Sequence, residues 1–155
     1  MAARDYIIDP ATLDFDHVIA NLEDIRKYNP QRFEMEQLTA IVHEDEARGL
    51  CVGYKDVTRD EFWVRGHFPA MPLMPGVLMC EAIAQVGAYA VLNDERFAGK
   101  LPLFGGLDGA RFRRQVGPGD TLELVVELVI ELAVAAELLA DHTIIRSCST
   151  QHCAN

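Results

Sequence analysis

Residues 75–92 read PGVLMCEAIAQVGAYAVL, and this run decides the fold. Apolar side chains stand at nearly every position around the helical turn, a pattern typical of a helix that protein surrounds instead of one lying on a surface. A proline at the start of the run suits the first turn of a helix. The sequence therefore predicts a long central buried helix.

The sequence before and after this helix predicts strands. Two apolar runs, 38–42 and 50–54, flank a polar turn and indicate a hairpin, and 61–65 adds a short strand. After the helix, 101–116 looks extended, and 121–132 alternates apolar residues with glutamates, which predicts a long strand with one face exposed. We therefore expect an α+β fold in which an antiparallel sheet wraps around the central helix.

Two terminal regions complete a single domain over residues 1–155. Residues 14–28 carry apolar side chains at helical spacing, which predicts an amphipathic helix in the N-terminal region, 1–30. Beyond residue 132 the strand alternation stops, and the segment 133–155 begins with an alanine-rich run that suits a helix better than a strand. A short strand is expected at 143–146.

Composition limits the classes of function. Half of the 155 residues are apolar, which is enough for one hydrophobic core. The formal net charge of −10 opposes binding to nucleic acid or to an anionic membrane surface. No apolar run approaches the roughly 20 residues of a membrane-spanning helix. We therefore expect a cytoplasmic protein with neither nucleic acid nor membrane as partner.

Cysteine and histidine spacing predicts neither a disulfide framework nor a metal site. The four cysteines are scattered along the chain. Ligand-type residues gather near the C-terminus, but their spacings match no zinc pattern: His142, Cys148, His152 and Cys153. We expect no metal and no cofactor.

The loop that leads into the central helix holds the first candidate site residues. Residues 66–77 read GHFPAMPLMPGV, and prolines at spacing three keep the loop extended and delay the helix start. His67 therefore has a fixed position. The first N–H groups of the helix lack partners within it and lie at its positive end, so they can hold a polarised carbonyl oxygen. Gly76 has no side chain to block that approach.

Glu81 is the second candidate, because it is the only charged side chain between His67 and Asp94. Burying an unpaired carboxylate costs several kcal/mol, so a carboxyl group in such a helix usually has a partner and a use. Gln85 stands one turn later on the same face, where it could hydrogen-bond near Glu81 and support it. The helix therefore carries a carboxyl group with a function.

Residues 66–85, GHFPAMPLMPGVLMCEAIAQ, resemble the signature of the FabZ-type 3-hydroxyacyl-[acyl-carrier-protein] dehydratases, which adopt the hotdog fold. Gly117-Pro118-Gly119-Asp120 is similar to a second landmark of that family, and the resemblance runs from about residue 53 to 131. It implies a homodimer, with a trimer of dimers as a further option. His67 of one subunit would face Glu81 of the other, beside acyl tunnels at the dimer interface.

The chemistry that the resemblance implies is the removal of water from 3-hydroxyacyl thioesters on acyl carrier protein in fatty acid biosynthesis. A neutral His67 takes the C2 proton, Glu81 as the acid donates to the departing hydroxyl, and the N–H of Gly76 stabilises the enolate-like charge. Phe68 and Val77 are candidates for the substrate tunnel. The basic cluster of Arg111, Arg113 and Arg114 is either a solvated face or a docking site for the acidic carrier protein.

Two alternatives stay open on the same scaffold: a hotdog acyl thioesterase and a non-catalytic acyl-binding subunit. The chain also departs from the family pattern in two places. Pro30-Gln31-Arg32-Phe33 resembles the family's Pro-His-Arg element without the histidine, and the segment 133–155 replaces a final hairpin of two strands. The entrance to the acyl tunnel and the last edge of the sheet are therefore expected to differ.

Overall fold

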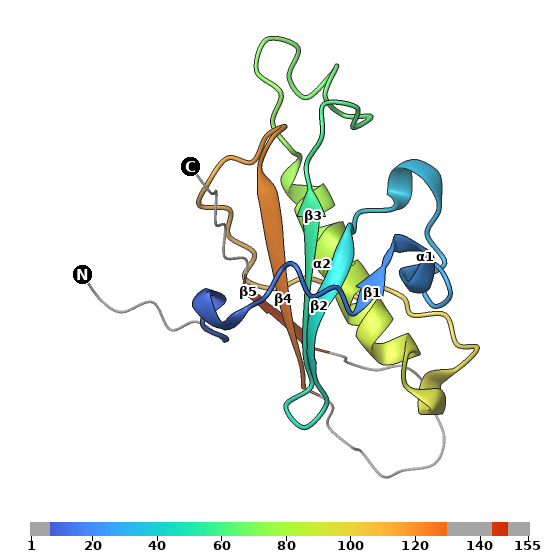
Figure 1. The fold of residues 1–155 in the computed structure, drawn as a ribbon. Coiled ribbons are helices and arrows are strands. Elements are labelled where there is room, and N and C mark those ends of the chain that lie inside the picture. The colour runs from blue at the N-terminus through green and yellow to red at the C-terminus, as the bar shows by residue number, and fades with distance from the viewer. Residues whose placement is uncertain (1–6, 130–143, 149–155) are drawn as a thin grey trace.

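An antiparallel sheet packs one face against a long helix in this computed structural model, which describes residues 7–129 and 144–148. The strand order is β1-β2-β3-β4-β5, so each described strand pairs with its neighbour in sequence (Figure 1). The strands are β1 (Ala20–Asn21), β2 (Ala40–Asp45), β3 (Leu50–Asp56), β4 (Thr121–Val129) and β5 (Ile144–Cys148). The α-helices are α1 (Leu22–Ile25) and α2 (Gly76–Leu92), and the 3-10 helices are η1 (Pro10–Thr12), η2 (Phe33–Met35) and η3 (Glu95–Phe97).

The predicted central helix is confirmed as α2, which begins directly after Pro75. Its side chains Ile83 and Val86 belong to the main core cluster together with Leu124 of β4. A Cβ atom on Gly53 of β3 would lie 3.1 Å from a methyl group of Val86, so glycine at this position permits the close approach of helix and sheet. The fold is therefore the predicted α+β arrangement around a central helix.

The predicted hairpin is confirmed by β2 and β3, which pair with a register shift between Ile41 and His43. The short strand predicted at 61–65 is wrong. This segment forms turns instead, because the carbonyls of Glu61 and Trp63 accept hydrogen bonds from the nearby N–H groups of Val64 and Gly66. Residues 101–115 have no regular secondary structure and are exposed apart from the partly buried Pro102, so the extended run there adds no strand.

The N-terminal helix predicted over 14–28 is also wrong, since only the four residues of α1 are α-helical there. The side chain of Asn21 accepts a hydrogen bond from the N–H of Asp24, and Asp24 returns one to the N–H of Asn21. This capping box starts the helix at Leu22. Ahead of it, the N–H of Ile19 donates to the carbonyl of Ile41, so the chain joins the sheet and cannot be helical.

The second face of the sheet is covered, although the alternation in 121–132 predicted an exposed face. Glu123 of β4 is 5 % exposed. A smaller cluster on this face is formed by buried Val42, Leu50, Val52 and Val125, with Ile7, Ile8, Leu13, Phe15 and Tyr54 packed against it. Figure 1 shows the N-terminal segment crossing the sheet on the side opposite α2. This segment covers the predicted outer face.

The C-terminal strand predicted at 143–146 is confirmed as β5, which pairs antiparallel with β4 from Val125 to Val129. The far half of β4 therefore has a hydrogen-bonded neighbour. The helical run expected after residue 132 lies outside the described residues.

Candidate active site

The loop before α2 fixes His67 through its backbone and its ring. The N–H of His67 donates to the carbonyl of Trp63 at 2.8 Å, and its carbonyl accepts from the N–H of Leu73 at 2.8 Å. The ring atom Nδ1 lies 2.8 Å from the carbonyl oxygen of Leu73. Because a carbonyl oxygen can only accept, Nδ1 is the donor in this contact, and in the neutral tautomer that fits it Nε2 has the free lone pair. The loop thus uses Nδ1 to orient the ring and leaves Nε2 without a hydrogen bond among the described residues.

The surroundings of the ring leave Nε2 accessible. Within residues 7–129 and 144–148, Nε2 has no hydrogen-bond partner, and the His67 side chain is half-buried. The neighbouring Phe68 ring stacks on the imidazole, with centroids 4.2 Å apart, and is 51 % exposed. One face of the histidine is therefore packed while its basic nitrogen stays open.

Two anchors hold this loop against the rest of the molecule. The N–H of Met74 donates to the carbonyl of Val116 at 2.7 Å. In the turn that follows Val116, the N–H of Gly117 donates to the carboxylate of Asp120 at 2.8 Å. On the other side, Lys55 of β3 forms an ion pair of 2.8 Å with Glu61. The predicted turn at 117–120 is confirmed, and it supports the path of the loop into α2.

Replacing Lys55 by methionine is expected to destabilise the fold by about 3–5 kcal/mol, because Glu61 would remain as a buried, unpaired charge. The two side chains are only 7 % and 11 % exposed. Denaturant unfolding measures the effect, with Lys27→Met, which removes an exposed ion pair to Asp24, as the control. Lys55→Met/Glu61→Met should recover much of the loss. Equal stability of the Lys55 and Lys27 variants would contradict the assignment.

The first turn of α2 presents backbone donors at its N-terminus. The N–H groups of Leu78 and Met79 donate to the carbonyl of Pro75. Those of Gly76 and Val77 have no hydrogen-bond partner among the described residues. Unpaired N–H groups at the positive end of a 17-residue helix favour a polarised carbonyl oxygen. This is the arrangement predicted for Gly76.

Phe112 covers the Cα atom of Gly76. A Cβ atom at this position would lie 2.8 Å from two carbons of the Phe112 ring, which itself is 56 % exposed. The glycine is therefore needed for the contact between the 101–115 segment and the helix start. An alanine here would push the ring away.

If the helix start binds the thioester carbonyl, as the family resemblance implies, Gly76→Ala is expected to lower kcat/KM about tenfold, since the displaced Phe112 ring disturbs that helix start. Combining the change with Phe112→Ala removes the clash, so the effect of Gly76→Ala should be clearly smaller in that background. Steady-state kinetics on the four variants of this cycle measure the coupling. Additive effects would show that the ring contact is irrelevant.

Glu81 is held by amide groups on one of its two oxygens. Its Oε1 accepts hydrogen bonds from Gln85 Nε2 at 2.7 Å and from Gln31 Nε2 at 3.3 Å. The carboxyl side chain is partly buried and not fully enclosed, because the α2 face that carries it is only partly covered in the single chain. The sequence predicts a helix that protein surrounds, and the partial exposure of Glu81 departs from that prediction.

Gln85 connects this carboxyl group to the loop before β2. It is 2 % exposed, its Oε1 accepts from the N–H of Gln37 at 2.9 Å, and its Nε2 also donates to the carbonyl of Met35 at 2.6 Å. A buried amide with both ends satisfied has a fixed orientation. Gln85 is therefore placed as the support that the sequence predicted near Glu81.

The remaining candidates lie on the surface of the chain. Val77 is 75 % exposed, and the described residues offer no ion-pair partner to Arg111, Arg113 or Arg114, which are exposed. His67 and Glu81 share no hydrogen bond or ion pair in the described part of one chain. One chain alone does not bring the two predicted catalytic groups into contact.

Three other features of the described residues concern metal ligands, membrane-spanning helices and thiols. Three or more potential metal ligands gather nowhere in residues 7–129 and 144–148. The described helices include none long and apolar enough to cross a membrane. Cys51 and Cys80 are free thiols, and burial raises the pKa of each. Neither thiol is therefore activated as a nucleophile.

Sequence reasoning missed two contributors to the site. The carbonyl of Leu73 orients the His67 ring, but a backbone group leaves no trace in residue types. Gln31 contacts Glu81, and its only signal was the departure of Pro30-Gln31-Arg32 from the expected tripeptide. Only the fold shows that the loop of Gln31, 50 residues before Glu81 in sequence, packs against α2.

The fold and these groups define a FabA-like domain, and the family model of that description matches residues 29–146. Curated relatives bear the name 3-hydroxyacyl-[acyl-carrier-protein] dehydratase FabZ. The protein of Clostridium botulinum strain Loch Maree is 46 % identical over 108 residues, which cover 70 % of this chain and 74 % of that protein. The protein of Clostridium kluyveri strain NBRC 12016 is 44 % identical with the same coverage. The chain therefore belongs to the FabZ-type dehydratase family.

Proposed function

We propose that this chain dehydrates 3-hydroxyacyl thioesters carried by acyl carrier protein, with His67 as the base and Glu81 as the acid. The observation that carries the assignment is the 2.8 Å contact between His67 Nδ1 and the carbonyl of Leu73, which leaves Nε2 as a free base. Conversion of a 3-hydroxyacyl thioester to the 2-enoyl thioester tests it, and this conversion should be lost in both His67→Gln and Glu81→Gln.

The proposed reaction uses three groups. Nε2 of His67 takes the proton from C2, and the electrons of that C–H bond form the C2=C3 double bond as the C3–O bond breaks. The N–H of Gly76 stabilises the negative charge that develops on the thioester oxygen. Glu81 gives its proton to the departing hydroxyl, which leaves as water. The step ends with a protonated histidine and a carboxylate, and proton transfer resets them.

The active unit is proposed to be a homodimer in which His67 of one subunit meets Glu81 of the other. Two observations support this: the pair shares no hydrogen bond or ion pair within the described part of one chain, and apolar side chains close to both in sequence lie exposed. Phe68 is 51 % and Met71 52 % exposed in the His67 loop, and Val77, one turn before Glu81 on α2, is 75 % exposed. Exposed apolar side chains of this kind favour a protein partner. A second copy of this chain would cover them and enclose the acyl tunnel.

Pairing two inactive variants tests the shared site. Mixed dimers of His67→Gln and Glu81→Gln chains, isolated through two different tags, should regain about half the wild-type activity, because one of their two sites is complete. Mixed-tag dimers in which both chains carry His67→Gln should stay inactive. Mixed dimers as inactive as their parents would place both groups of a site in one subunit.

Acyl carrier protein is the proposed partner, since an acidic carrier would be attracted to a local basic surface. Arg111, Arg113 and Arg114 form such a surface on a chain whose formal net charge is −10. Opposite charge speeds the encounter and sets its orientation more than it adds affinity. A cytoplasmic location is proposed with this function.

A further inference from the structure

Gln31 is the second hydrogen-bond donor to Glu81, and it lies in a loop 50 residues away in sequence. Within the described residues, the only hydrogen bond of its side chain runs from Nε2 to Glu81 Oε1, at 3.3 Å. Gln85 Nε2 reaches the same oxygen at 2.7 Å. The other carboxyl oxygen, Oε2, has no hydrogen-bond partner in residues 7–129 and 144–148. The carboxyl group is thus held from one side.

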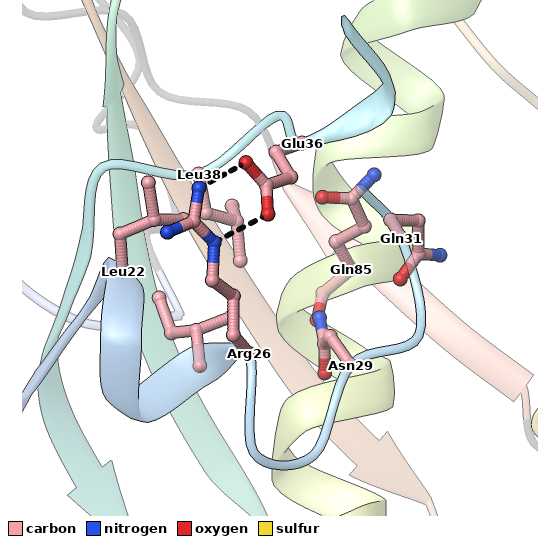
Figure 2. A pocket seen from close by; sticks show the side chains of 8 residues that line it. Leu22, Arg26, Asn29, Gln31, Glu36, Leu38 and Gln85 are labelled. Atoms are coloured by element: carbon pink, nitrogen blue, oxygen red, sulfur yellow. Dashed lines mark hydrogen bonds and ion pairs between the residues drawn. The ribbon is translucent and has the colours of Figure 1, made fainter. Parts of the chain in front are cut away.

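The loop over 26–37 keeps its place without the help of the Gln31 side chain. Arg26 and Glu36 close it with paired contacts of 2.6 and 2.7 Å, and the Arg26 guanidinium holds the pKa of Glu36 below its usual value. Asn29 Nδ2 donates to the carbonyl of Gln85 at 2.9 Å. Figure 2 shows Gln31 beside Gln85 and Asn29, with the Arg26–Glu36 pair across a small pocket. These contacts hold the loop so that Gln31 lies next to α2.

The two amides matter because the last torsion of a glutamate is soft. Rotation about this sp³–sp² bond has broad, roughly two-fold minima, so one donor leaves the carboxyl plane poorly fixed. Two donors from different elements fix the plane of the Glu81 carboxyl group and make its two oxygens inequivalent, because both donors bind Oε1. An oxygen that accepts two N–H groups serves as the carbonyl oxygen of the neutral acid, which leaves Oε2 to bear the O–H.

We propose that Gln31 is a positioning residue for the acid step: with Gln85 it engages Glu81 Oε1, so that Oε2 carries the proton delivered to the departing hydroxyl. The inference rests on the proposed role of Glu81 as the acid. In the reaction the Oε2–H bond breaks, the new O–H bond completes water, and the charge left on the carboxylate faces the two amide donors. Gln31 itself does not touch the substrate.

Three substitutions test the proposal: Gln31→Leu removes the donor, Gln31→His replaces it with a ring N–H, and Glu34→Leu is the control in the same loop. Glu34 is exposed, and its side chain has no hydrogen bond in the described residues. Gln31→Leu should lower kcat about tenfold with KM within about twofold, as expected when an interaction made in the transition state is lost. Gln31→His should keep kcat within about threefold of wild type.

The kinetics of the Gln31 variants test the positioning role of Gln31, and those of Glu81→Gln test the proposed acid. If Gln31→Leu is no slower than Glu34→Leu, or if Gln31→His is as slow as Gln31→Leu, the proposal is overturned. A rise in KM with unchanged kcat would overturn it as well, since it would assign Gln31 to substrate binding. If Glu81→Gln keeps wild-type kcat, the proposed function fails first, and the inference fails with it.

Discussion

Replacing His67 by glutamine is expected to lower kcat for dehydration about 10²- to 10⁴-fold, the range that a general base contributes. The amide keeps a polar group that can donate to the carbonyl of Leu73, but it has no basic nitrogen to take the C2 proton. The backbone bonds of the loop stay in place, so substrate binding should change little. Steady-state kinetics at saturating substrate measure the loss.

His17→Gln is the matched control for this change, because His17 is exposed and lies far along the chain from the loop. Its kcat should equal that of the wild type. Thermal melting of both variants tells a catalytic loss from a folding defect. A His67→Gln variant that keeps more than about a tenth of the wild-type kcat would contradict the role of His67 as base.

Glu81→Gln should lower kcat by a similar factor, about 10²- to 10⁴-fold, since an amide cannot deliver a proton to the departing hydroxyl. The replacement keeps the size of the side chain, and its oxygen still accepts from Gln85 Nε2. The fold should therefore be preserved. Product formation is followed by the absorbance of the enoyl thioester.

Glu95→Gln provides the comparison for Glu81, since Glu95 lies exposed just beyond the end of α2. We expect full activity from it. If Glu81→Gln dehydrates substrate as fast as Glu95→Gln, another group must donate the proton. Loss of activity with a lowered melting temperature would instead assign Glu81 to stability.

The central helix and the loop before it could be predicted because their signals are local. A helix over the 18 residues 75–92, which are apolar at nearly every position, is stable only when most of its surface is buried. The three prolines in 66–75 restrict the backbone conformations of the loop before it. Family resemblance added the expectation that His67 of one subunit meets Glu81 of another, which stays a prediction. The same local reasoning was wrong for 14–28, where helical spacing of apolar residues competed with a capping box at Asn21 and with pairing to β2.

Long-range contacts account for the other differences. The alternation in β4 correctly predicted the face that packs on α2, but nothing in it revealed that the N-terminal segment covers the opposite face and buries Glu123. Gln31 contacts Glu81 from a loop 50 residues away in sequence, whereas Gln85 contacts it from one turn along the same helix, α2. Spacing predicted the second of these and could not predict the first.

The most direct test incubates the wild-type chain with a 3-hydroxyacyl thioester and follows the enoyl product and free thiol in the same sample. We predict enoyl thioester without thiol release, and loss of that product in both His67→Gln and Glu81→Gln. Thiol release without enoyl product would contradict dehydration and favour a thioesterase. Enoyl formation that survives both substitutions would show that other residues carry the reaction.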